Sequence, residues 1–125
     1  MSPALRDPAI RVTLLPRDTN RHGTIFGGIL LQHLDLAGTV EANRNGHHPY
    51  VTVCIHEVVF KAPVYVGDLV SFYTKTKKVG RTSVTVLVDV EAERADGTTV
   101  DVTSAELVYV AVDQGGHPIP VRPQK

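Results

Sequence analysis

The sequence has a single cysteine, no surplus of charge of either sign, and no hydrophobic run long enough to span a bilayer. One free thiol, that of Cys54, suits a reducing compartment. Lysine plus arginine equals aspartate plus glutamate at 13 each, whereas a general nucleic-acid binder normally carries a basic surplus. The first residues, MSPALRDPAIRV, lack the basic start and apolar run of a secretory signal. We therefore expect a cytoplasmic protein with no nucleic-acid partner and no membrane partner.

The length of the chain, 125 residues, suits one domain of common size and is too short for two. A chain of this length buries roughly two-thirds of its unfolded surface and needs no disulfide. We expect a single domain over residues 1–113. Residues 114–125 are rich in glycine and proline, and they are expected to form a C-terminal tail without core positions.

One segment has the apolar spacing of a helix, and most of the remaining sequence predicts strands. The helix is expected to start at Gly27-Gly28 and to end near Asn43, with apolar residues at positions 30, 31, 34, 37 and 40. Strands are predicted at 9–15, 50–60, 69–79, 83–94 and 100–112. Short turns such as GRT and ADGTT make neighbouring strands antiparallel. The expected fold is α+β, with one helix on an antiparallel sheet whose uncovered edges favour pairing with a second copy.

A lone carboxylate, Asp35, stands in the apolar part of the predicted helix, next to Leu34 and Leu36. A buried, unpaired carboxylate is costly and tends to shift its pKa. Asp35 therefore either points to solvent from the polar face of the helix or is present for chemistry. The residues alone favour neither reading.

Five stretches of the sequence, taken in order, resemble a known family. They are DTNRHGTIFGG (18–28), LDLAGTVEA (34–42), VTVCIHEVVFKAPVYVGD (51–68), KVGRTSVTVLVDVEAE (78–93) and AELVYVAVD (105–113). Together they resemble the hot-dog acyl-CoA thioesterases, in particular the small bacterial YciA-type hydrolases related to animal cytosolic and brain acyl-CoA hydrolases. The resemblance implies a five-stranded antiparallel sheet wrapped around a central helix. It also implies self-association as an edge-to-edge dimer, and further as a tetramer or a hexamer built as a trimer of dimers.

The same resemblance implies which residues carry the chemistry. Asp35 matches the catalytic carboxylate of the family, as a general base or as a nucleophile. Gly28, at the helix start beside Phe26 and Gly27, is expected to offer a backbone N–H to the thioester oxyanion. Asn20 is expected to orient water or the carbonyl, facing the helix of the partner chain, although a turn-forming asparagine is the commoner fate.

The coenzyme A part of the substrate is expected at a basic turn. The family uses the turn formed by Gly80, Arg81, Thr82 and Ser83 for the pantetheine and nucleotide, and phosphate groups suit such a turn. The alternative, a charged strand edge that discourages aggregation, is favoured for Lys75.

Other candidate groups are weaker. His22 is expected at the mouth of the pocket, where many relatives carry asparagine, and His56 is a strand histidine of the kind that is more often structural. The histidines show no metal-ligand spacing, so neither a metal nor a cofactor is expected, and acyl-CoA is the substrate. The absence of G-x-S-x-G argues against a serine triad. Cys54, expected to be buried in mid-strand, is a poor nucleophile.

The sequence therefore predicts hydrolysis of acyl-CoA to a free fatty acid and coenzyme A. Two alternatives remain open. A dehydratase or hydratase of the same fold would need a histidine and an acid to move protons on the acyl chain, and only His22 or His56 could supply the histidine. A non-catalytic acyl-CoA binding protein would bind without turnover, and the presence of Asp35 argues mildly against it.

Overall fold

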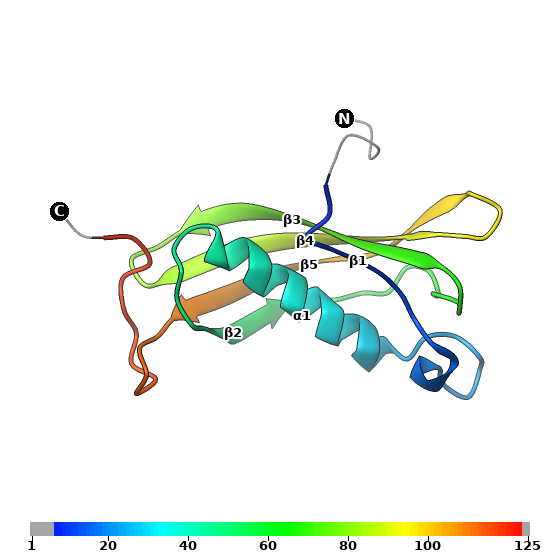
Figure 1. Cartoon of the computed structure of the whole chain (residues 1–125), viewed down its shortest axis with the longest axis horizontal. Helices are drawn as coiled ribbons and strands as arrows, with labels where there is room; N and C mark the ends of the chain where they lie inside the picture. The colour runs from blue at the N-terminus through cyan, green and yellow to red at the C-terminus, as the bar shows by residue number, and fades with distance from the viewer. Residues whose placement is uncertain (1–6, 124–125) are drawn as a thin grey trace.

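The computed structural model describes residues 7–123, so the first six residues of the predicted domain and the last two of the predicted tail lie outside it. Five antiparallel strands form one sheet in the order β1-β3-β4-β5-β2, and helix α1 lies across one face of the sheet (Figure 1). The elements are β1 (Ile10–Thr13), a short 3-10 helix η2 (Pro16–Asp18), α1 (Gly27–Asn43), β2 (Tyr50–His56), β3 (Leu69–Val79), β4 (Ser83–Glu93) and β5 (Thr99–Ala111). The predicted fold is confirmed.

The core lies between α1 and the sheet. Every second residue of β4 points into it, and these residues are at most 2% exposed: Val84, Val86, Val88, Val90 and Ala92. Leu30, Leu34 and Ala37 of α1 pack against them. Burying one such valine or leucine side chain contributes about 1.5–3 kcal/mol, so this layer fixes α1 on the sheet. The period-two pattern of the sequence is confirmed in β4.

The buried face of α1 differs from the predicted one in its C-terminal half. Val40 is 42% exposed, whereas Glu41 is 8% exposed. The carboxylate of Glu41 is buried because Thr74 and Thr76 of β3 donate hydrogen bonds to its two oxygens, at 2.9 and 2.6 Å. Val40 and Leu36, one helical turn apart, therefore remain on the outer side of the helix.

Strand β2 ends earlier than the sequence pattern predicts. It stops at His56, and Glu57 adopts a positive φ of 40°, which takes the chain out of the sheet. The following residues cross β5 instead of pairing along it: Thr103 Oγ1 donates to the carbonyl of Val59, and the N–H of Lys61 donates to that of Val102, both at 2.7 Å. This crossing brings Phe60 to the N-terminus of α1.

The sequence PVYVGD forms a tight turn that leads into β3. Gly67 has a φ of +93°, a conformation that favours glycine. The Asp68 carboxylate accepts a hydrogen bond of 2.9 Å from the N–H of Tyr65 and forms an ion pair with Arg94. The Arg94 guanidinium also lies 4.6 Å from the centre of the Tyr65 ring. This buried ion pair ties the turn to the hairpin between β4 and β5.

The C-terminal segment does contain a core position, contrary to the expectation for the tail. Val121 is 1% exposed. Its N–H donates to the carbonyl of Arg81 at 2.9 Å, and its own carbonyl lies 2.8 Å from Nε2 of His48. The N–H of Ile119 donates to the carbonyl of Ala111 at 2.9 Å. The proline-flanked segment therefore closes one end of the molecule beside the turn between β3 and β4.

Candidate functional site

Asp35 lies in the middle of α1, on the side that faces β2 and β5. One carboxylate oxygen, Oδ1, accepts hydrogen bonds from Thr52 Oγ1 at 2.8 Å and from the Tyr109 hydroxyl at 2.9 Å. Within residues 7–123 the other oxygen, Oδ2, accepts none. The side chain is half-buried in this chain. Asp35 is thus neither isolated among leucines nor simply solvated: one oxygen is held and one is left available.

The Tyr109 phenol is a firm hydrogen-bond donor to this carboxylate. Its side chain is fully buried, and burial together with the neighbouring charge of Asp35 raises its pKa above the usual range. The hydroxyl is consequently held in its protonated form, in which it can donate. Sequence reasoning missed both Tyr109 and Thr52. The available signals were a tyrosine in the apolar stretch of β5, whose hydroxyl needs a partner when buried, and a glycine, Gly38, inside the helix.

The N-terminus of α1 presents free backbone donors. The first N–H groups that bond back are those of Ile29 and Leu30, both to the carbonyl of Phe26. Among the described residues, the N–H groups of Gly27 and Gly28 have no acceptor. Phe60 packs 3.4 Å from where a Cβ of Gly27 would stand. The lack of side chains at these two positions keeps the donors accessible.

A cavity of about 270 Å³ opens beside this helix start. It is lined by Thr24, Ile25, Gly27, Leu30 and residues 60–64. Most of these side chains are apolar, and the N–H of Ile25 is already bonded to the carbonyl of Val64. The cavity therefore suits an apolar chain next to the free N–H groups.

Gly28 and Asp35 lie on the same side of the helix but at different heights. Seven residues correspond to two turns, which places the two positions on one face and separates them by about 10 Å along the axis. An oxyanion donor and a base must each come within about 3 Å of the reacting groups. The two groups of one chain are therefore badly placed to act on the same carbonyl.

Asn20 uses its side chain within its own loop. Its Nδ2 donates to Thr24 Oγ1 at 2.8 Å, and its Oδ1 accepts from the N–H of His22 at 2.8 Å and of Thr24 at 3.3 Å. In this chain the asparagine shapes the turn that contains Gly23, with a φ of +81°. The His22 side chain is exposed. Roles for Asn20 and His22 in catalysis stay predictions.

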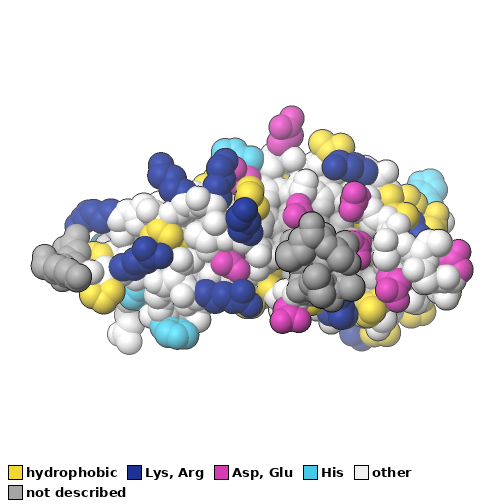
Figure 2. All heavy atoms as spheres, turned by 90° about the horizontal axis from the view of Figure 1, so that it is seen from above, with side chains coloured by type: hydrophobic (Ala, Val, Ile, Leu, Met, Phe, Trp, Pro, Cys, Tyr) yellow, Lys and Arg dark blue, Asp and Glu magenta, His cyan; other side chains and the backbone are white. Residues whose placement is uncertain are grey.

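The predicted coenzyme A turn is joined by a residue that the sequence did not single out. Arg81 and Arg122 line a cavity of about 220 Å³ together with Val79, Gly80 and Pro120. Thr82 and Ser83 hold the turn through their carbonyls, which accept from Ala111 and Gly80. Figure 2 shows the molecule from above, with lysine and arginine side chains gathered over the left half of the view. Arg122 was missed because its segment was expected to be an unpacked tail.

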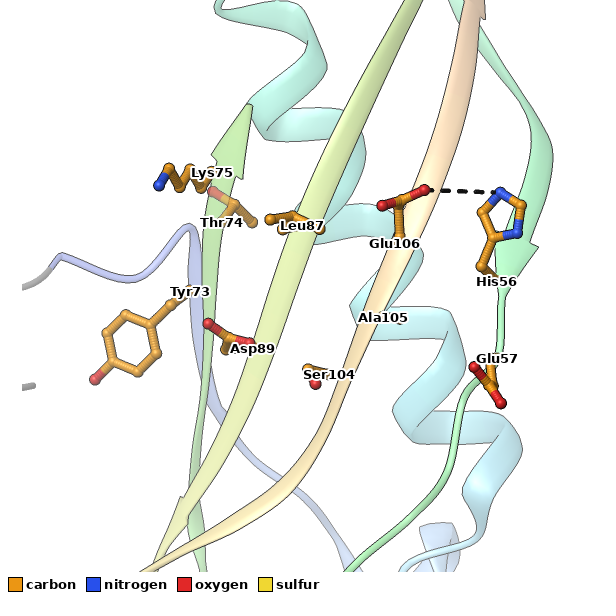
Figure 3. A pocket seen from close by; sticks show the side chains of 10 residues that line it. All are labelled: His56, Glu57, Tyr73, Thr74, Lys75, Leu87, Asp89, Ser104, Ala105 and Glu106. Atoms are coloured by element: carbon orange, nitrogen blue, oxygen red, sulfur yellow. Dashed lines mark ion pairs between the residues drawn. The ribbon is translucent and has the colours of Figure 1, made fainter. Parts of the chain in front are cut away.

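A cavity of about 480 Å³ lies on the face of the sheet opposite α1, between strands β2 to β5 (Figure 3). His56 contributes to it and lies 3.9 Å from Glu106, which also binds Lys77. No hydrogen bond joins His56 to Asp35 among the described residues, so this face is separate from the carboxylate. The Cys54 thiol, expected to be buried, is half-exposed next to His56 at 3.4 Å because β2 is an edge strand.

Residues 7–123 contain no group of three or more histidine, cysteine, aspartate or glutamate side chains that could hold a metal ion. In the same part of the chain, none of the helical segments has the length and apolar character needed to cross a membrane.

Comparison with known proteins was made for the whole chain. The model of the thioesterase superfamily matches residues 22–99. The acyl-CoA thioester hydrolase YciA of Salmonella typhimurium is 36% identical over 116 residues, covering 90% of this chain and 87% of that protein. A hexameric hotdog fold thioesterase of Campylobacter jejuni aligns with a TM-score of 0.87 at 40% identity, covering 92% of this chain and 90% of that one. A hexameric broad-specificity acyl-coenzyme A thioesterase, solved with an aspartate replaced by alanine, aligns with a TM-score of 0.89 at 31% identity, covering 96% and 89%.

Proposed function

The chain belongs to the thioesterase superfamily, and we propose that it hydrolyses acyl-CoA thioesters to a free fatty acid and coenzyme A. The observation that carries the proposal is the state of Asp35, whose Oδ1 is pinned by two donors while Oδ2 is available. A carboxylate held in this way on a rigid helix is suited to act on water or on a thioester carbonyl.

The reaction follows from these groups. As a base, Asp35 Oδ2 takes a proton from water while the water oxygen attacks the carbonyl carbon. Backbone N–H groups at the start of α1, foremost that of Gly28, stabilise the oxyanion. The tetrahedral intermediate then collapses, the carbon–sulfur bond breaks, and the departing thiolate takes up the proton held by Asp35. As a nucleophile, Asp35 would instead attack the carbonyl carbon and displace the coenzyme A thiolate, and water would open the resulting anhydride to the fatty acid and the Asp35 carboxylate.

A site complete enough for this chemistry needs two copies of the chain. The axial offset between Gly28 and Asp35 separates them within one chain. Strand β2 is an uncovered edge of the sheet, and its sequence YVTVCIH carries no lysine, glutamate or proline to discourage pairing. Exposed apolar side chains stand on it and on the outer side of α1: Leu36, Val40, Val51, Val53 and Ile55. We infer that two copies join along β2, so that Gly28 and Asn20 of one copy serve Asp35 of the other.

Higher assembly is supported by relatives that are themselves hexameric. Three edge-paired dimers would give such a particle. The opposite edge strand, β1, has only four residues and includes Arg11, so it is a less favourable surface for a second edge pairing.

We propose that the nucleotide end of the substrate binds at Arg81 and Arg122. Guanidinium groups bind phosphate through charge-assisted hydrogen bonds. The free thiol of Cys54 supports a reducing compartment, and we place the activity in the cytoplasm.

The competing functions have weaker support. A dehydratase or hydratase needs a histidine beside the acid, whereas His22 and His56 are both exposed, and among the described residues neither forms a hydrogen bond with Asp35. An acyl-CoA binding protein without turnover would need no carboxylate with an available oxygen.

The experiment is release of free thiol from an acyl-CoA panel spanning acetyl to palmitoyl, with wild type beside Asp35→Asn. The asparagine keeps an oxygen for Tyr109 and Thr52 but cannot accept a proton, so fold and positioning are retained. Asp101→Asn, at an exposed position of β5, is the matched control. We expect turnover by wild type and by the control, and a loss of about a thousandfold or more in Asp35→Asn. If wild type binds acyl-CoA but does not hydrolyse it, the chain is a non-catalytic acyl-CoA binding protein and the hydrolase proposal fails.

A further inference from the structure

The hydroxyl of Tyr109 contacts Asp35 twice. It lies 2.9 Å from Oδ1 of the carboxylate and 2.9 Å from the backbone carbonyl oxygen of the same residue. Tyr109 belongs to β5, in the middle of the sheet, and its ring is fully buried. The phenol therefore crosses from a central strand to the helix and ends at one residue.

Gly38 makes this contact possible. A Cβ at this position would stand 2.0 Å from the Tyr109 hydroxyl oxygen and 2.8 Å from Cζ of its ring. Glycine is unfavourable in a helix interior, so its presence three residues after Asp35 needs a reason. The notch that it leaves in α1 is filled by the phenol.

Thr52 completes the arrangement from the other side. Its hydroxyl donates to the same oxygen, Oδ1, from β2 at 2.8 Å. Two donors on one oxygen fix the side-chain rotamer and aim Oδ2 away from them. Among the described residues these two side chains are the hydrogen-bond partners of the carboxylate, and Tyr109 is the titratable one.

We propose that Tyr109, seated in the notch at Gly38, is the positioning residue that holds the catalytic carboxylate of Asp35 aimed at the substrate. The inference rests on the proposed function of Asp35. Tyr109 does not touch the substrate, because its ring and hydroxyl are enclosed by the sheet and the helix. It acts through the carboxylate alone.

The phenol stays a donor, since burial and the charge of Asp35 raise its pKa. Removal of the hydroxyl leaves Thr52 as the one side chain that donates to Oδ1, so the direction in which Oδ2 points is held less firmly. Because Tyr109 acts on the carboxylate and not on the substrate, kcat should fall about tenfold with little change in KM.

The test uses Tyr109→Phe, which keeps the buried ring and removes only the hydroxyl. Tyr50→Phe is the matched control, because the Tyr50 hydroxyl donates at 2.7 Å to the carbonyl of Gly46, away from Asp35. Gly38→Ala keeps both functional groups but fills the notch. We expect Tyr109→Phe and Gly38→Ala both to lower kcat with little change in KM, and Tyr50→Phe to leave kcat and KM unchanged.

A second measurement covers the case in which these variants fold poorly. Replacement of Tyr109 by 3-fluorotyrosine preserves the shape and makes the phenol a stronger donor. The kcat should then stay at or above the wild-type value, opposite to the fall in Tyr109→Phe. A merely structural tyrosine would give no such opposite changes in kcat.

The outcomes separate this inference from the proposed function. If wild type turns over and Asp35→Asn does not, yet both tyrosine replacements leave kcat unchanged, the positioning role is overturned. If Asp35→Asn retains the wild-type rate, the assignment of the carboxylate fails first, whatever the tyrosine variants do.

Discussion

Thr76 Oγ1 of β3 lies 2.6 Å from Oε2 of Glu41, a carboxylate buried between the end of α1 and the sheet. Thr74 donates to the other oxygen at 2.9 Å, and Arg44 lies 3.3 Å from it. Asn45 donates at 2.9 Å to the hydroxyl oxygen of the same Thr76. The carboxylate therefore fastens the C-terminal half of α1, the half that follows Asp35, to β3.

Replacement of this carboxylate tests that anchoring. Glu41→Ala leaves the hydroxyls of two half-buried threonines without their acceptor, so we expect a loss of about 2 kcal/mol in the free energy of unfolding. Glu41→Gln keeps one acceptor oxygen and should lose less. Urea denaturation of both variants measures the difference. Equal losses would mean that the threonines find other acceptors, and that hydrogen bonding to Glu41 does not hold the helix.

The fold was largely predictable because most segments bury one regular face. The alternating valines of β4 and the Gly27 start of α1 are local patterns, and the structure reproduces both. The prediction failed where a long-range partner overrides the local pattern. Glu41 is buried only because two threonines of β3 meet it. Val121 is buried only because its segment pairs with the turn at Arg81.

The candidate site was predictable in its residue types but not in its connections. The acid in an apolar run marks Asp35 as unusual, and the resemblance gives it a role. The two donors that hold it, Thr52 and Tyr109, lie 17 and 74 residues away along the chain. No spacing rule relates a helix residue to central-strand and edge-strand residues at such separations. The role of Asp35 itself stays a prediction until it is replaced.

An ion pair on the outer face of the sheet predicts a pH-dependent contribution to stability. The hydrogen bond from Lys77 to Glu106 holds the pKa of that carboxyl below its ordinary value of 4.5. A lowered folded-state pKa gives stability that is present above the unfolded value and is lost as pH falls through the folded one. We expect Lys77→Met to lower the melting temperature slightly at pH 7 and not at about pH 3.

The control for this ion pair is Lys75→Met, on the same strand and likewise exposed. Its melting temperature should follow that of wild type at both pH values. A Lys77→Met deficit that persists unchanged in acid would point to lost packing of the lysine stem instead of lost charge pairing.

Self-association along β2 predicts what a charge on that edge does. Val53 is 55% exposed in the single chain, so a lysine there leaves the core of the chain intact. Val53→Lys places like charges opposite each other in the paired edge and should shift the particle toward single chains in light scattering. The turnover of acyl-CoA should fall as the share of single chains rises. Thr13→Lys, on the opposite edge strand, should leave both unchanged. A monomeric variant with full turnover would place the whole site in one chain.

Arg81 and Arg122 line one basic cavity, and their replacement separates binding of the nucleotide from chemistry. If both contact phosphate groups of coenzyme A, Arg81→Ala and Arg122→Ala should each raise KM for acyl-CoA about fivefold to tenfold, with kcat little changed. The same variants should act like wild type on an acyl N-acetylcysteamine thioester, which keeps the thioester and lacks the nucleotide. Lys75→Ala is the control with equal loss of charge. A KM increase of the same size on the truncated substrate would show that these arginines support the fold of the turn and not the phosphates.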